Sequence, residues 1–392
     1  MLGPFALAPK ATMSARALPL AEALAARGHR VTVILPPWDN PAQSGRTWQD
    51  AGVAIRNISL PRRFETAGIV YRLLRAVHES RPDLVHLFKP KGHGALAALA
   101  LGRRYPLVVD TDDWEGRGGW NDLNPYSPAQ RALFAWQERD LPRRAAATTV
   151  ASRALEARVR GFGVPPGRVC YLPNGVSRRR HGDWAAAAER APDVRRRLGL
   201  GDAPTVLLYT RFVEFAPARA VALFQSVLQE VPGARVLVIG KGFFGEEEVL
   251  LRQAGAAGIA DRVTHLPWVE REVLPAHLAA GDVAVLPYDD TPVNRAKCSV
   301  KTLDLLTAAR PVVAEAVGQN RDYLEDGVSA LLVPPGATER FARAVADLLR
   351  DRERRCRIAL AARERVWREF DWARLVERAE ASYAAAIRSR AR

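Results

Sequence analysis

Four acidic residues stand within one short stretch of the chain. Asp110, Asp112, Asp113 and Glu115 begin where an apolar, β-branched run ends. Such a group at the carboxyl end of a strand is unusual for a purely structural role. The carboxylates could take a proton from a substrate hydroxyl, hold a divalent cation through oxygen ligands, or pair with the many arginines of the chain. We favour catalysis or substrate binding by Asp112 and Asp113, and metal binding least.

Basic residues follow the apolar run at 84–88. Lys89, Lys91 and His93 stand at the expected carboxyl end of that strand, where side chains of an α/β sheet meet ligands. Lys89 or Lys91 could bind an acidic substrate. His86, inside the strand, is as readily a hydrogen-bonded core histidine as a functional one.

Two further segments could contact a substrate. Lys10 and Thr12 lie in the loop at 8–14 and could meet an anion there, although an ordinary surface loop is an equal alternative. Trp114, beside the acidic group, could stack on a sugar or a lipid, or it could pack as part of a lid.

An anion site is predicted in the second half of the chain. The loop at 294–301 leads into a helix predicted at 302–309, so Ser299, Val300 and Lys301 bring free backbone amides and an ammonium group to a helix N-terminus. Asp304 follows one turn later and could accept hydrogen bonds from ribose hydroxyls. The alternative is that Asp304 interacts only with the helix dipole and that Lys301 is solvated.

Short apolar segments alternate with amphipathic ones from end to end, which predicts two α/β domains with doubly wound parallel sheets. A cleft that receives the carboxyl ends of both sheets is expected. The first series of predicted strands comprises 2–8, 31–35, 84–88, 107–110, 148–151 and 169–172. The second series comprises 206–209, 236–240, 263–266, 283–286, 312–314 and 331–333. A helix is predicted over 14–27, with Gly28 as its stop signal.

The domain boundary is predicted where polar, glycine and proline residues interrupt this alternation. We predict an N-terminal domain over 1–176, a linker over 177–204 and a C-terminal domain over 205–370. A C-terminal helix at about 371–392 is expected to pack back on the first domain.

Composition excludes several classes of protein. The 392 residues are 48% hydrophobic and 26% charged, which is globular composition. No apolar run is long enough for a membrane span, so a cytoplasmic protein is expected. The three cysteines have no metal-ligand spacing. The net charge of +15 comes with no nucleic-acid module, so we expect no nucleic acid partner but allow peripheral contact with an anionic membrane.

An ordered series of motifs resembles the large retaining glycosyltransferase family 4, also called group 1, which has the GT-B fold. The matching segments are 26–33, 151–155, 171–176, 206–212, 309–313, 318–322 and 326–336. They cover nearly the whole chain. The resemblance implies transfer of a sugar from a nucleoside-diphosphate sugar to an acceptor, with retention of configuration and without a required cofactor. The acceptor could be a small molecule, a glycan or a lipid.

The resemblance also implies roles for single residues. Arg211 would contact the donor phosphates, and its fork of N–H donors suits them. Asp304 would bind the donor ribose, and Gly318 and Gln319 would lie by the diphosphate. Asp322 closes the same turn. Charge stabilisation of the departing diphosphate would be the main catalytic requirement, met by Arg211, Lys301 and helix amides.

Three positions depart from the family pattern. Lysine stands at 297, in the region of the first family glutamate, and Ala216 replaces a family lysine. Asp112 stands where the family often has a histidine. Two other classes therefore stay open at this point: a nucleotide-sugar epimerase or phosphorylase with the same fold, and a non-catalytic partner subunit. The sequence does not specify the donor base, the sugar or the acceptor.

Overall fold

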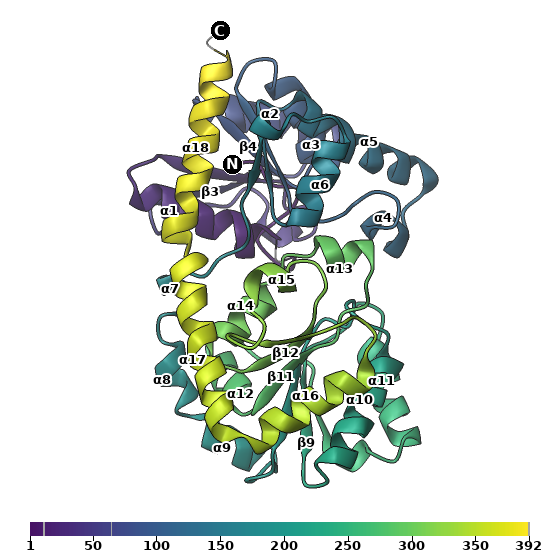
Figure 1. The fold of residues 1–392 in the computed structure, drawn as a ribbon. Helices are drawn as coiled ribbons and strands as arrows, with labels where there is room; N and C mark the ends of the chain where they lie inside the picture. The colour runs from purple at the N-terminus through teal and green to yellow at the C-terminus, as the bar shows by residue number, and fades with distance from the viewer. Residues whose placement is uncertain (11, 64, 391–392) are drawn as a thin grey trace. The chain divides into compact units, whose positions relative to one another are not determined.

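The computed structural model describes residues 1–10, 12–63 and 65–390, and its chain forms two compact units (Figure 1). Unit 1 comprises Met1–Gly175, Arg295–Cys298 and Trp372–Arg392. Unit 2 comprises Val176–Asn294 and Ser299–Asp371. Residues 391 and 392 of the predicted C-terminal helix lie outside the described residues. Both units are α/β and contain parallel strands, as the alternating sequence pattern predicts.

The strands of unit 1 form two ladders on either side of residue Leu2. One ladder has the order β1-β3-β2 and the other β4-β5-β6-β7. Leu2 pairs in parallel with Ile34 of β1 and with Leu87 of β4, and so joins the two. The strands are β1 (Val31–Leu35), β2 (Thr47–Asp50), β3 (Val53–Asn57), β4 (Val85–Phe88), β5 (Leu107–Thr111), β6 (Ala147–Val150) and β7 (Val169–Tyr171).

The strand predicted over 2–8 is therefore wrong in extent. The amide of Leu2 donates to the backbone carbonyl of His86 at 2.8 Å, and the amide of Gly3 donates to the backbone carbonyl of Ile34 at 3.0 Å. Pro4 has no N–H group, so the ladder cannot continue past it. Residues 2 and 3 nevertheless hold the predicted central place in the sheet.

The hairpin of β2 and β3 was not predicted from the sequence. These strands pair antiparallel, and the connecting residues Ala51 and Gly52 have φ angles of 47° and 79°. Two consecutive positive φ values are typical of the tight turns that join hairpin strands. The half-exposed pattern of β2, with Trp48 and polar neighbours, gives little hydrophobic signal.

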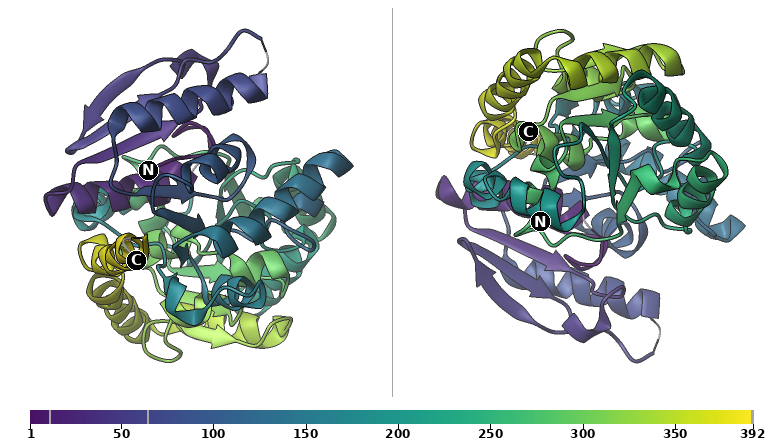
Figure 2. Two further views of the ribbon diagram at one scale, coloured as in Figure 1. Left: turned by 90° about the horizontal axis from the view of Figure 1, so that it is seen from above. Right: turned by 90° about the horizontal axis from the view of Figure 1, so that it is seen from below.

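Helices cover both faces of the unit 1 sheet. Residues of α2 and α3 share one apolar core with β4 and β5, and residues of α1 and α18 share another with β1 and β3. Figures 1 and 2 show α18, in yellow, beside α1. The helices are η1 (Met13–Ala17, a π-helix), α1 (Leu18–Ala26), η2 (Pro41–Gln43), α2 (Glu65–Ser80), α3 (Gly92–Leu101), α4 (Trp120–Leu123), α5 (Pro128–Arg144), α6 (Arg153–Gly161), η3 (Pro166–Arg168) and α18 (Trp372–Arg390).

His86 is a buried core histidine. Its Nδ1 atom lies 2.7 Å from the Tyr383 hydroxyl, and its Nε2 atom lies 3.2 Å from Oγ1 of Thr149. Burial lowers the pKa of His86 to about 3, so the ring is neutral in the folded chain near pH 7. Of the two alternatives for His86, the structure supports the core role.

The neutral state of His86 makes folding sensitive to acid. An unfolded histidine takes up a proton near pH 6.5, whereas folded His86 does so only near pH 3. Between these values the unfolded chain binds more protons, so stability should fall with falling pH, by at most about 1.4 kcal/mol per pH unit. We expect His86→Gln to reduce this slope in urea unfolding between pH 7 and pH 4. The exposed His78→Gln is the matched control, and an unchanged slope in His86→Gln would contradict the assignment.

The sheet of unit 2 has the order β10-β9-β8-β11-β12-β13, and the recorded pairings are all parallel. The chain proceeds outward from β8 to β10 and then crosses back to β11, which makes the sheet doubly wound. Its strands are β8 (Thr205–Tyr209), β9 (Arg235–Ile239), β10 (Val263–Leu266), β11 (Val283–Leu286), β12 (Val312–Glu315) and β13 (Leu331–Val333).

Unit 2 begins with three short helices where the sequence predicts a linker. α7, α8 and α9 contain the buried residues His181, Trp184 and Val194, so the segment 177–204 contributes to the packing of this unit. Its glycines and prolines end these short helices rather than mark an extended connection. The helices are α7 (Arg178–His181), α8 (Trp184–Ala188), α9 (Ala191–Arg197), α10 (Pro217–Glu230), α11 (Glu246–Ala256), η4 (Ala260–Arg262), α12 (Leu274–Ala279), α14 (Val300–Thr307), α15 (Asn320–Tyr323), α16 (Thr338–Arg350) and α17 (Arg352–Glu369), with α13 (Pro292–Ala296) at the boundary.

Within the part of the chain that the structure describes, no helix has both the length and the apolar character that crossing a membrane requires.

Candidate functional site

The acidic group of unit 1 lies at the carboxyl end of β5, next to the end of β4. Phe88 and Asp110 are partners in the parallel ladder, so the loops that follow the two strands start side by side. Nζ of Lys89 lies 2.5 Å from Oδ2 of Asp113 and 3.9 Å from Oδ1 of Asp112. The same ammonium group lies 3.0 Å from Glu115. The structure thus brings Lys89 together with the predicted carboxylates.

Lysines neutralise part of this acidic group. Nζ of Lys91 lies 2.5 Å from Oε2 of Glu115 and also faces the rings of Tyr126 and Phe134, at 4.5 and 4.8 Å. One alternative was that the carboxylates pair with arginines. Asp113 and Glu115 instead pair with lysines.

Asp112 and Asp113 differ in their electrostatic surroundings. Burial raises the pKa of Asp112 to about 7, with help from the neighbouring carboxylates of Asp113 and Asp110. Burial also opposes ionisation of Asp113, but the Lys89 ammonium outweighs it and lowers the pKa of that carboxyl. Oδ1 of Asp112 is buried and accepts no hydrogen bond from the described residues. A carboxylate that titrates near neutral pH suits general-base catalysis better than one that is held ionised.

Asp110 pairs with an arginine, which is one of the alternatives predicted for the acidic group, although the sequence did not identify the partner. Arg16 binds Asp110 with two parallel hydrogen bonds, from Nε at 2.7 Å and from Nη2 at 2.6 Å. Arg16 also donates to Oδ1 of Asn174 at 3.1 Å, and all three residues are buried. The position of Arg16 in the sequence carries a signal, because it falls at helical spacing with the apolar residues Leu20 and Leu24.

The other predicted acceptor-side residues gather around Trp38 and Arg158. Nζ of Lys10 lies 4.2 Å from the ring of Trp38, and His93 packs edge-on to the same ring at 6.5 Å. Trp114 stacks on the Arg158 guanidinium at 3.8 Å. Thr12 precedes η1 and makes no side-chain capping hydrogen bond.

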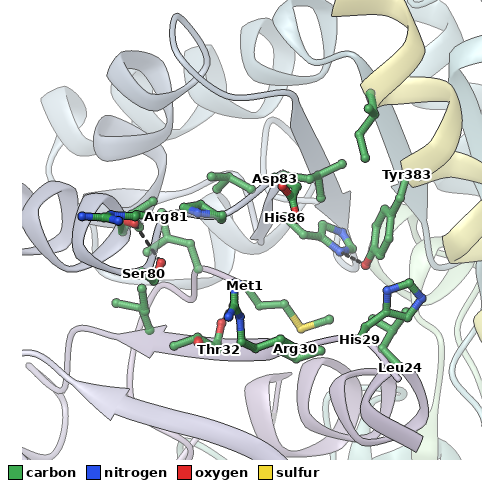
Figure 3. Close-up of a pocket in the computed structure, with 18 residues that line it drawn as sticks. Met1, Leu24, His29, Arg30, Thr32, Ser80, Arg81, Asp83, His86 and Tyr383 are labelled. Atoms are coloured by element: carbon green, nitrogen blue, oxygen red, sulfur yellow. Dashed lines mark hydrogen bonds between the residues drawn. The ribbon is translucent and has the colours of Figure 1, made fainter. Parts of the chain in front are cut away.

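A pocket in unit 1 opens at the opposite end of the strands, as Figure 3 shows. Met1, Thr32, His86 and Tyr383 line it, near the amino ends of β1 and β4. None of the predicted site residues lines this pocket. Because ligands of open α/β sheets bind at the carboxyl ends of strands, we do not assign the catalytic site to it.

In unit 2, β8 and β11 are neighbours from which the chain proceeds in opposite directions. Such a switch point is where ligands bind in doubly wound sheets. Arg211 follows β8, and α14 follows β11 after a connection that contains α13. The switch point therefore positions both predicted donor segments.

Tyr209, at the end of β8, connects the predicted donor residues. Nζ of Lys301 lies 4.7 Å from the centre of its ring, and the Asp304 carboxylate lies close enough to interact electrostatically with its hydroxyl. Burial raises the pKa of Tyr209, and Asp304 adds to the rise while Arg271 and Arg211 oppose it. The sequence analysis gave Tyr209 no role, although it directly precedes the Thr210-Arg211 pair.

Arg211 contacts an aromatic ring and no carboxylate. Its guanidinium lies 4.9 Å from the ring of Phe243, in the loop after β9. Among the residues that the structure describes, no acidic side chain forms an ion pair with it. By contrast, Arg219 is bound by Asp289 and, at 2.5 Å, by Glu315. The charge of Arg219 is thus balanced within unit 2.

The start of α14 has the geometry expected of a helix N-terminus. Ser299 is its N-cap residue, and its hydroxyl accepts from the amide of Thr302 at 3.3 Å. The helix begins at Val300, two residues before the predicted start, so Val300 and Lys301 occupy its first turn. Asp304 is 2% exposed and is hydrogen-bonded within the protein.

The turn after β12 lies next to α14, because α15 contacts that helix. Gly318 has a φ angle of +50°, which explains the glycine by backbone conformation alone. Gln319 is buried, and Asp322 lies in α15 with its carbonyl accepting from Arg365 at 3.1 Å. Within the described residues, no group of three or more His, Cys, Asp or Glu side chains could hold a metal ion.

The two units and their switch-point residues define a two-domain α/β transferase architecture, and comparisons with known proteins agree. Residues 11–175 match the glycosyl transferase 4-like domain, and residues 203–351 match the group 1 glycosyl transferases. A GDP-mannose-dependent alpha-(1-6)-phosphatidylinositol monomannoside mannosyltransferase of Mycobacterium tuberculosis H37Rv is 32% identical over 360 residues, which cover 88% of this chain and 87% of that protein. The chain belongs to the group 1 glycosyltransferases and is a glycosyltransferase.

Other similar proteins include further glycosyltransferases. An alpha-D-kanosaminyltransferase of Streptomyces kanamyceticus is 31% identical, over 58% of this chain and 57% of that protein. Among solved structures, Anabaena HepE in complex with UDP has a TM-score of 0.73 at 18% identity and covers 98% of this chain and 99% of its own. The glycosyltransferase WaaG of lipopolysaccharide biosynthesis has a TM-score of 0.69 at 17% identity, with 98% of each chain covered. These similarities establish the GT-B fold, as the sequence resemblance implies.

Proposed function

We propose that this chain transfers a glycosyl group from a nucleoside-diphosphate sugar to an acceptor hydroxyl with retention of configuration, and that unit 2 binds the donor. The observation that carries the proposal is the Arg211 guanidinium, which stands at the β8–β11 switch point without a carboxylate partner among the described residues. A partly exposed arginine in that position is available to an anionic ligand.

Three groups together suit a diphosphate. Arg211 offers a fork of N–H donors, Lys301 adds an ammonium group, and the first turn of α14 adds backbone amides. We propose that they stabilise the negative charge that develops on the diphosphate as its bond to the anomeric carbon breaks. Because these cations supply the charge stabilisation, we propose that the reaction needs no divalent metal.

We propose that unit 1 binds the acceptor with Lys10, Thr12, Lys89, His93 and Trp114, and that Asp112 receives the proton of the attacking hydroxyl. The Lys10 ammonium group, which lies over the rings of Phe5 and Trp38, suits an acceptor that carries acidic groups as well as hydroxyls. Relatives act on phosphatidylinositol monomannoside and on D-inositol 3-phosphate, which are acceptors of that chemistry. Contact with an anionic membrane remains a prediction that rests on the net charge of +15.

The test is a calorimetric binding screen with UDP, GDP, ADP and dTDP, followed by the corresponding sugar donors. We expect saturable binding of one nucleotide, and turnover of one of its sugars with phosphatidylinositol or an inositol phosphate as acceptor. The anomeric configuration of the product, read by NMR, tests retention. Binding of none of the four nucleotides would contradict the proposed donor site.

A further inference from the structure

A histidine from another part of unit 2 holds the carboxylate of Asp304. Nε2 of His181, in α7, lies 3.1 Å from Oδ1 of Asp304 in α14. The two side chains are 2% and 3% exposed. His181 also packs against the ring of Trp184, with the ring centres 4.9 Å apart. Because 123 residues separate the partners, the contact depends on the fold and not on local chain geometry.

The surroundings of the ring direct an N–H group at Asp304. The amide of Ser177 approaches Nδ1 of His181 at 3.3 Å, so a neutral ring that accepts this bond carries its proton on Nε2. If the ring is protonated, Nδ1 can instead donate to the Ser177 carbonyl at 3.2 Å. At Nε2, Nη2 of Arg271 approaches at 3.3 Å and can only donate, whereas the Asp304 carboxylate at 3.1 Å can only accept, so the bond to Asp304 forms when the proton is on Nε2.

Other groups approach the same carboxylate without saturating it. Tyr209 interacts electrostatically with Asp304, and Nη2 of Arg271 lies 4.0 Å from Oδ1. A carboxylate has about four lone-pair sites, and the bond from His181 uses one of them. Acceptor capacity therefore remains for hydroxyl groups of a ligand.

We propose that His181 is a positioning residue for donor binding: it fixes the rotation of the Asp304 carboxylate so that its remaining acceptor sites face the donor ribose. This rests on the proposed function, in which Asp304 binds the ribose hydroxyls. An aspartate side chain that is free to rotate would lose entropy on binding, whereas one held by His181 is already oriented.

The test compares UDP and GDP with their 2′,3′-dideoxy counterparts by calorimetry in the full chain. Removing the hydroxyl groups should weaken binding to the wild-type protein. His181→Met removes the N–H donor, whereas His181→Gln retains one. We expect the preference for the ribose form to fall about tenfold in His181→Met, as for loss of an oriented charge-assisted hydrogen bond, and to recover largely in His181→Gln.

The variant Asp304→Asn separates this proposal from the one on which it rests. If the preference for ribose disappears in Asp304→Asn but persists in His181→Met, the positioning role of His181 is wrong and the ribose role of Asp304 stands. If Asp304→Asn keeps the preference for ribose, the ribose role of Asp304 and the positioning role of His181 are both wrong. If none of UDP, GDP, ADP and dTDP binds the wild type, the donor site itself is wrong. Thermal unfolding of each variant without nucleotide shows whether the substitution damages the fold. A purely structural effect would weaken binding of the ribose and dideoxy forms equally, and that result would overturn the positioning role.

Discussion

Replacing Arg211 with alanine is expected to weaken binding of the nucleoside diphosphate by about 10- to 150-fold. Hydrogen bonds to charged groups contribute about 1.5–3 kcal/mol each, and that range converts to this change in Kd. The loss should appear with the diphosphate and not with the free nucleoside, because Arg211 is proposed to contact phosphate alone. The measurement is isothermal titration calorimetry with both ligands.

Two further variants sharpen the interpretation of Arg211. Lysine retains the charge but lacks the planar fork, so Arg211→Lys should fall between the wild type and alanine. Arg252→Ala removes an exposed arginine from α11 and serves as the matched control for net charge. The fold decrease in kcat/KM of Arg211→Ala should exceed the fold decrease in its affinity for the diphosphate, because the charge on the leaving diphosphate grows in the transition state. Unchanged diphosphate binding in Arg211→Ala would remove the central support of the donor site.

The sequence predicts the strands of unit 2 well, but it predicts the extent of the first strand and the structure of segment 177–204 poorly. Apolar β-branched runs identify every parallel strand of unit 2, since buried strands have a strong signal. Residues 1–3 pair with two strands, but the pairing ends at Pro4 because proline has no amide N–H group. A hydrophobicity pattern does not show such a missing donor. The segment 177–204 has the composition of a linker, yet His181 and Trp184 bury their rings there.

The candidate site is predictable in its charged residues and less so in the residues that hold them. Lys89 and the carboxylates were each predicted at the carboxyl end of a strand, but their pairing was not predicted, and the structure places them within hydrogen-bonding distance. The partners of Asp110 and Asp304 come from distant segments. Arg16 lies 94 residues from Asp110, and His181 lies 123 residues from Asp304. No local spacing encodes such contacts, so only the folded chain reveals them.

Replacing Asp112 with asparagine is expected to lower kcat by about 10²- to 10⁴-fold, the usual contribution of a general base. Nucleotide binding should not change, since the proposed donor residues all belong to unit 2. The wild-type rate should rise with pH and level off above about pH 7, where the Asp112 carboxyl is ionised and can accept a proton. The asparagine variant should lack this rise. Asp113→Asn removes a neighbouring carboxylate that raises the pKa of Asp112, so this variant should keep the rise in rate but shift it to lower pH.

Stability separates this catalytic effect from damage to the fold. The folded pKa of Asp112, about 7, lies above its unfolded value of about 3.9, so between these pH values the folded chain binds more protons. Wild-type stability should therefore fall as pH rises from about 4 to about 7, by at most about 1.4 kcal/mol per unit. Asp112→Asn removes that penalty and should be the more stable protein at pH 8 while being the slower enzyme. A variant that is stabilised but retains its kcat would show that Asp112 is a buried carboxylate without a catalytic role.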